Sequence, residues 1–217
     1  MITNTAREEM LSKVRAALQR TPDSGVAAIP AVARIAPRTT GDVEAEFALL
    51  FTEIEKLGGR TKRLKKKADL KEALRELVEA ESIKKATLWQ TAELTKIGVE
   101  KTLKSIGVEI VSPYAPNREV AECDLGVTGV DFALPETGTL VLRSSTEQPR
   151  TVSLLPRVHL AFIRPACLCA DLHQVFEEAK TDGYFVFVTG PSRTADIELT
   201  VTIGVHGPKT LCVVLIE

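Results

Sequence analysis

The chain has 217 residues, a length that suits one α/β domain with a small appendage. Hydrophobic residues make up 44% and charged residues 26%, the balance of an ordinary soluble globular protein. Its 28 basic and 29 acidic residues give a net charge of −1, so no overall field favours nucleic acid or an anionic membrane as a partner.

The chain begins with a predicted amphipathic helix and a long linker. Leu11, Val14 and Leu18 share one face of a helix over residues 3–20, with charged residues opposite. The next residues, to Pro37, are rich in Pro, Ala and Gly, and a loop of that length is uncommon inside a compact domain. We therefore expect an arm that docks on its own chain or on a partner. The expected organisation is a helical arm over 1–20, a linker over 21–40 and an α/β domain over 41–217.

Helices and short strands alternate through the next seventy residues. Asp42 can cap a helix that runs to about Leu57, where two glycines end it. The elements that follow are a strand at 60–64, a helix from Asp69 to about Glu81, a strand at 86–89, a helix at 92–104 and a strand at 108–111. This alternation predicts crossover connections and a parallel sheet.

Strands dominate the second half of the chain. Asp131–Leu134 and Thr139–Arg143 bracket a tight turn, which predicts a strand-turn-strand unit. Residues 197–203 alternate apolar and polar side chains with a period of two, which predicts a half-buried strand that forms a hairpin with the last strand. The other predicted elements are a strand at 158–163, a helix at 168–180, a buried strand at 184–188 and the last strand at 210–216.

No segment predicts a membrane span, a metal site or a nucleotide-binding site of the Walker A or Gly-x-Gly-x-x-Gly kind. The longest apolar runs have strand length, and charged residues interrupt the N-terminus where a secretory signal needs an apolar run. Cys167 and Cys169 have no second pair at metal-site spacing, and neither a Walker A sequence nor a Gly-x-Gly-x-x-Gly follows a strand. We expect no cofactor, free thiols and a cytoplasmic location. The basic run 60–67 has only Trp89 as a nearby stacking group, so a solvated face is favoured over nucleic-acid binding.

The turn Glu136–Thr139 is the first of three segments that could carry chemistry. Gly138 permits a close backbone approach, and the hydroxyls of Thr137 and Thr139 could bind an anion together with backbone N–H groups. Glu136 could act as acid, base or nucleophile if it faces a cleft. The alternative is a hairpin turn in which the threonines only satisfy the backbone.

The second segment, Thr189–Glu198, follows the most apolar strand, and ligands in open α/β sheets bind outside the carboxyl ends of strands. Asp196 and Glu198 would share one face of a strand and are predicted to be catalytic. The alternative is a charge-compensated structural network with the arginine. Hydroxyl donors and a guanidinium fork suit a carboxylate or phosphate, and the predicted ligand-binding residues are Gly190, Ser192, Arg193 and Thr194.

The third segment is the turn Val205–Lys209. His206 in a Gly/Pro turn can titrate near neutrality and serve as acid or base, so it is predicted to be catalytic. The alternative is a surface histidine. His159, at a strand start, and His173, in a predicted helix, are weaker candidates, and three scattered histidines do not make a metal site.

Taken together, these motifs resemble the lactate utilization protein C family, whose domain is called LUD. Pro135 departs from the pattern, because a small residue such as alanine is expected before Glu-Thr-Gly-Thr. The resemblance covers nearly the whole chain. Its specific segments are Gly126–Leu140, Arg150, Ser153–Pro156 with His159, Thr189–Glu198 and Gly204–Lys209, and the N-terminal helix ending in Leu18-Gln-Arg20 is also similar.

The resemblance implies a Rossmann-like mixed sheet like that of the ribose-5-phosphate isomerase and CoA-transferase group. It also implies a role in oxidising L-lactate to pyruvate beside two iron–sulfur proteins. Because this chain has no cysteine cluster, the leading hypothesis is a non-redox subunit that binds a small carboxylate or phosphate. An alternative is a stand-alone enzyme of the CoA-transferase or sugar-phosphate isomerase kind, with Glu136 or Glu198 as nucleophile or base. A third is an assembly module without chemistry.

Overall fold

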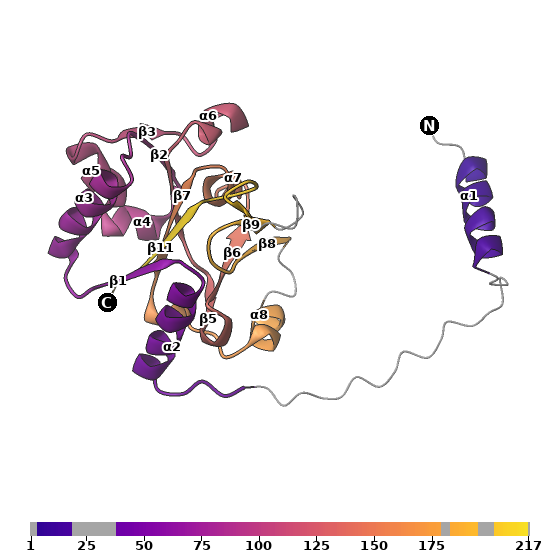
Figure 1. The fold of residues 1–217 in the computed structure, drawn as a ribbon, viewed down its shortest axis with the longest axis horizontal. Coiled ribbons are helices and arrows are strands. Elements are labelled where there is room, and N and C mark those ends of the chain that lie inside the picture. Colours follow the sequence, from indigo (N-terminus) through magenta and orange to yellow (C-terminus); the bar gives the residue numbers. More distant parts are fainter. Residues whose placement is uncertain (1–3, 19–37, 179–182, 195–201, 217) are drawn as a thin grey trace. The chain divides into compact units, whose positions relative to one another are not determined.

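A computed structural model of the protein describes residues 4–18, 38–178, 183–194 and 202–216 (Figure 1). The chain divides into two compact units, Met1–Ala36 and Pro37–Glu217. The first unit contains helix α1 (Asn4–Ala17), on which Met10 and Val14 are exposed. Most of the predicted linker lies outside the described residues.

Six strands of the second unit form a parallel sheet in the order β1-β11-β7-β4-β2-β3. The predicted parallel sheet is therefore confirmed. Its central strands are buried along almost their whole length, because a parallel strand covered on both faces needs a continuous apolar run. The strands are β1 (Arg60–Leu64), β2 (Lys85–Leu88), β3 (Glu109–Val111), β4 (Leu125–Gly129), β7 (Val158–Ile163) and β11 (Thr210–Ile216).

Helices α3 (Leu70–Ala80), α4 (Ala92–Ile97) and α5 (Val99–Ser105) lie on one side of this sheet (Figure 1). The continuous helix predicted over 92–104 is wrong, since Gly98 has a φ of 86° and separates α4 from α5. The other short helices are η1 (Lys67–Asp69), α6 (Asn117–Ala121), α7 (Thr151–Leu154) and η3 (Pro165–Cys167).

A second, antiparallel sheet lies on the other side, in the order β5-β6-β8 (Figure 1). Its strands are β5 (Phe132–Leu134), β6 (Thr139–Ser144) and β8 (Tyr184–Val188), and the short helix η2 (Pro135–Thr137) joins the first two. The predicted strand-turn-strand unit is confirmed. Helix α8 (Leu172–Glu178) begins four residues later than predicted, because Leu168 bridges to Ala133 and the Asp171 carboxylate accepts a hydrogen bond from the Gln174 N–H.

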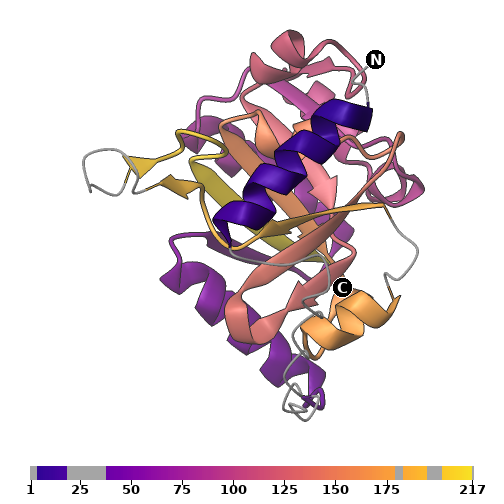
Figure 2. The same ribbon diagram turned by 90° about the vertical axis from the view of Figure 1, so that its right-hand side faces the viewer.

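Strands β9 (Arg193–Thr194) and β10 (Thr202–Ile203) form an antiparallel hairpin. Figure 2 shows this hairpin extending away from both sheets. The predicted pairing of residues 197–203 with the last strand is wrong: β11 lies between β1 and β7 in the main sheet, where both of its faces are buried. Residues 195–201 lie outside the described residues.

Helix α2 (Val43–Lys56) is preceded by Asp42, whose carboxylate caps it by accepting hydrogen bonds from two backbone N–H groups. Its Glu46 is only 4% exposed and accepts two hydrogen bonds from Arg38 Nη2, at 2.7 and 2.8 Å. Burial alone would raise the pKa of Glu46, but Arg38 and the Gly41 N–H lower it below its usual range. This pair therefore fixes the chain at the start of α2.

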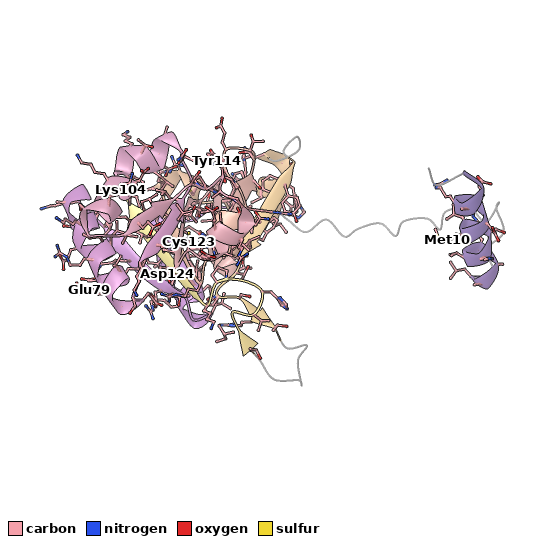
Figure 3. The ribbon with its side chains drawn as sticks, turned by 90° about the horizontal axis from the view of Figure 1, so that it is seen from above. Met10, Glu79, Lys104, Tyr114, Cys123 and Asp124 are labelled. Carbon is pink, nitrogen blue, oxygen red and sulfur yellow. The ribbon has the colours of Figure 1, made fainter. Side chains whose placement is uncertain are left out.

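A polar cluster closes the amino ends of the central strands. Asp124, labelled in Figure 3, accepts hydrogen bonds from the backbone N–H groups of Lys84 and Lys85 at 2.8 and 3.1 Å. Arg157 Nε donates to the same carboxylate at 3.2 Å. Burial alone would raise the pKa of Asp124, but these hydrogen bonds outweigh it and hold the pKa below its usual range.

No helix of the described residues is long and apolar enough to cross a membrane.

Candidate functional site

A cleft of about 260 Å³ brings together several of the predicted site residues. It lies between α7, the loop after β8 and the turn before β11, at the amino ends of β7 and β11. Only the loop after β8 thus fits the expectation that ligands bind beyond the carboxyl end of a strand. The polar residues that line the cleft are Ser153, His159, Thr189, Ser192, Arg193 and His206, and Gly190 lines it too.

The loop after β8 is held against the end of α2. Gly190 has a φ of 85°, and a Cβ there would lie 2.9 Å from Cβ of Leu57. Arg193 Nη2 donates a hydrogen bond to the Leu57 carbonyl, which is at the C-terminus of α2. A cation is favourable there, because the last carbonyls of a helix lack partners and carry partial negative charge. Arg193 therefore stabilises α2, and its five N–H donors leave capacity for a further acceptor.

Backbone hydrogen bonds join this loop to the turn that carries His206. The Ser192 N–H donates to the Pro208 carbonyl at 2.9 Å, and the Gly204 N–H donates to the Ser192 carbonyl at 2.8 Å. A Cβ on Gly207 would lie 3.1 Å from Cβ of Ser192, so the two segments approach closely. They consequently present Ser192 and His206 to the same cleft, although His206 is also exposed to solvent.

The model of the LUD domain matches residues 48–216. The chain belongs to the LUD domain family. Two relatives of this LUD protein are named Lactate utilization protein C. The one from Halalkalibacterium halodurans is 31% identical over 159 residues, which is 68% of this chain and 69% of the relative. The one from Shouchella clausii is 30% identical over 158 residues, with the same shares.

A solved structure supports the fold of this LUD protein. The crystal structure of a DUF162 family protein from Deinococcus radiodurans superposes with a TM-score of 0.60. The match covers 82% of this chain and all of that one at 18% sequence identity, so it shows the fold alone. The mixed α/β architecture expected from the sequence is thus confirmed.

The Glu136–Thr139 turn of the LUD domain reaches the cleft through a chain of hydroxyls. Thr137 Oγ1 lies 2.8 Å from Thr139 Oγ1, which lies 2.8 Å from Oγ1 of Thr189 in the cleft wall. Gly138 has a φ of 61°, and a Cβ there would lie 2.9 Å from the Ile54 backbone nitrogen. Glycine is therefore needed for the turn to pack on α2.

Glu136 itself does not line the cleft. Its side chain is 61% exposed, and its Oε1 lies 3.1 Å from Arg38 Nε. Thr194 pairs with Thr202 in the β9–β10 hairpin and is also absent from the cleft wall. The predicted residues Asp196 and Glu198 lie outside the described residues.

His159, a weaker candidate from the sequence, lines the wall of the cleft. Its side chain is 1% exposed, and its Nε2 lies 2.9 Å from Thr128 Oγ1, while Nδ1 has no hydrogen-bond partner among the described residues. Burial lowers the pKa of His159 to about 4, so its imidazole is neutral at neutral pH. The available signal was a polar ring in the otherwise apolar strand β7.

The cleft combines one guanidinium, hydroxyls and imidazoles, which suits a small ligand with a carboxylate and a further polar group. Among the described residues, no group of three or more His, Cys, Asp or Glu side chains could hold a metal ion. All four cysteines are free and buried.

Proposed function

We propose that this protein acts in lactate utilization as a subunit without a redox group, together with iron–sulfur partner proteins, and that it binds a small carboxylate in the cleft. The relatives named Lactate utilization protein C support the pathway. The main support for the binding site is that one cleft is lined by Ser192, Arg193 and His206, which come from two separate segments.

The size and chemistry of the cleft support a short-chain acid. Its volume of about 260 Å³ is below the roughly 300–1,000 Å³ of pockets that hold drug-sized ligands. Arg193 offers a planar fork for a carboxylate, while Ser192 and His206 can bond a neighbouring hydroxyl or oxo group. An acid such as lactate or pyruvate has these two features side by side.

The pathway is tested by deleting the gene and growing the strain on L-lactate or on glucose. We expect growth to fail on L-lactate alone and to return when the wild-type gene is supplied. Normal growth of the deletion strain on L-lactate would show that the pathway assignment is wrong.

The cleft is tested by titrating the purified protein with L-lactate and pyruvate in a calorimeter. Arg193→Gln should weaken binding about tenfold or more, because it removes a charge-assisted hydrogen bond. Arg118→Gln is the matched control, since Arg118 is 93% exposed and lines neither this cleft nor another described cavity. Because Arg193 also caps α2, the melting temperature of each variant is measured alongside. If Arg193→Gln binds both acids like the wild type while remaining folded, the cleft is not the carboxylate site.

We assign the docking of partners partly to the N-terminal arm. Met10, Val14 and Leu18 are exposed large apolar side chains of this unit, and such a stripe is typical of a helix that packs on another surface. Deleting residues 1–20 should abolish co-purification with the iron–sulfur proteins and leave lactate binding unchanged. Unchanged co-purification would remove the arm from the interface.

No second function is favoured by a specific observation. The enzyme alternative needs Glu136 or Glu198 to face substrate: Glu136 pairs with Arg38 outside the cleft wall, and Glu198 lies outside the described residues. The same variant tests the assembly alternative. If the protein is an assembly module without chemistry, Arg193→Gln would leave lactate oxidation intact in the complemented strain.

A further inference from the structure

A larger cavity, of about 480 Å³, opens at the opposite edge of the main sheet. Leu64 ends β1, Ile216 ends β11 and Arg164 follows β7, so the cavity lies at the carboxyl ends of these three parallel strands. It shares no lining residue with the cleft. Its charged lining residues are Lys66, Glu93, Lys96 and Arg164, and Leu70 adds to the apolar wall.

Open α/β sheets bind ligands outside the carboxyl ends of their strands, and the carboxyl-edge cavity lies on that side of the sheet. The topological switch point lies between β2 and β4, on the far side of β7 from β11, because the chain leaves β2 toward β3 in one direction and leaves β4 toward β7 in the other. Glu93 lies beside it, because a Cβ on Gly129, the last residue of β4, would be 3.7 Å from Glu93 Oε2. The cavity volume is also within the usual range for a ligand of cofactor size.

The lining is apolar in its depth and cationic at its rim. Leu64 and Leu70 are buried, whereas Lys66, Lys96 and Arg164 are exposed. Among the described residues that line the cavity, three side chains are cationic and one, that of Glu93, is anionic. A wall of this kind fits a ligand that joins an anionic group to an apolar body.

Glu93 and Arg164 form the ion pair of the cavity, with Glu93 Oε1 2.5 Å from Arg164 Nε. Burial, and less strongly the Asp131 carboxylate, raise the pKa of Glu93, and Arg164 opposes them. The net pKa is above the usual range, so this carboxylate is held where its charge is disfavoured. An incoming anion would compete with it for the guanidinium.

We propose that the carboxyl-edge cavity is a second ligand site, for an organic anion with an apolar body, in which Arg164 anchors the anionic group and Glu93 yields its place on Arg164 to the ligand. This site goes beyond the proposed lactate function, because it uses other residues at the other edge of the sheet.

The test uses the full chain and the fluorescent probe 1-anilinonaphthalene-8-sulfonate, an aromatic sulfonate that has both features. Arg164→Gln should weaken probe binding about tenfold, because it removes the anchoring charge. Glu93→Gln should strengthen it several-fold, because it removes the competing charge with little change of shape. The exposed Arg118→Gln variant is the control and should bind like the wild type. Opposite effects of the two substitutions on probe affinity would show that the probe binds in this cavity. Binding of the probe to general apolar surface would not respond to the two substitutions in this way.

A displacement series tests the apolar body. Octanoate should displace the probe at concentrations at which acetate does not, because only octanoate fills the apolar depth. Equal displacement by the two acids would overturn the apolar requirement. If Glu93→Gln weakens probe binding or leaves it unchanged, Glu93 is not a competitor and the proposal fails, even where Arg164→Gln does not fold. Lactate titration of Arg164→Gln should match the wild type, so failure at this edge is separate from failure of the cleft.

Discussion

Acidification should destabilise this protein through one buried histidine. His159 is 1% exposed, and burial lowers its pKa from 6.5 to about 4. Between these two values the unfolded chain binds a proton at this side chain and the folded chain does not. The stability that His159 contributes is therefore fully present above pH 6.5 and is lost as the pH falls toward 4.

The size of the effect follows from the two pKa values. Each pH unit across the whole interval corresponds to about 1.4 kcal/mol, so the complete loss is about 3 kcal/mol. At pH 5 about 2 kcal/mol of this loss should already be present relative to pH 7.5, by the same linkage relation. A loss of this size is a large fraction of the free energy of unfolding of a marginally stable domain.

The assay is urea unfolding at several pH values between 7.5 and 5, for the wild type and for His159→Gln. The variant should be less stable at pH 7.5, because Gln does not reproduce the ring packing and the contact with Thr128. Its loss of stability on acidification should nevertheless be about 2 kcal/mol smaller than that of the wild type. Lowered carboxyl pKa values, such as that of Glu46, add an acid dependence to both proteins and cancel in the comparison. Parallel pH curves for wild type and His159→Gln would refute the reasoning.

Two further substitutions test the packing and the ion pair that position the cleft. Gly126→Ala should cost about 1–3 kcal/mol in urea unfolding, because the added Cβ would overlap the Val152 carbonyl of α7, whereas Gly183→Ala has open space and should be nearly neutral. Glu46→Gln should cost about 2 kcal/mol in the same assay by weakening the charge-assisted bonds from Arg38, and an unchanged midpoint would show that this pair does not fix the start of α2.

Much of the fold follows from local patterns, because each pattern reports how an element meets its neighbours. The alternation of helices and strands predicts the parallel sheet, and the Pro-Glu-Thr-Gly turn predicts β5 and β6. The strands that neighbour β11 could not be predicted from local patterns. Its run Leu211–Leu215 is buried on both faces, which requires a central position between other strands. Adjacency in sequence instead suggested a hairpin, because local periodicity carries no information on which distant strand is the neighbour.

The candidate site, too, could be predicted only in part from the sequence. Ser192, Arg193 and His206 stand in Gly/Pro turns, whose composition marks loops that can carry polar groups, and the structure brings them to one cleft. The partner of Glu136 was not predictable, since Arg38 lies about a hundred residues earlier and belongs to no motif. The carboxyl-edge cavity was not predictable either, because separate residues from the ends of three strands and from helices α3 and α4 line it, and no single sequence motif contains them.

The two cavities stand at opposite ends of the same strand, which is what makes them separable by experiment. His159 lies near the start of β7 and Arg164 directly follows its end, five residues later. At about 3.3 Å per residue these positions are roughly 16 Å apart, too far for one small acid to reach both. The strand between them is buried along its whole length, and the two cavities share no lining residue. A change in lactate binding can therefore be ascribed to the cleft, and a change in sulfonate binding to the carboxyl edge.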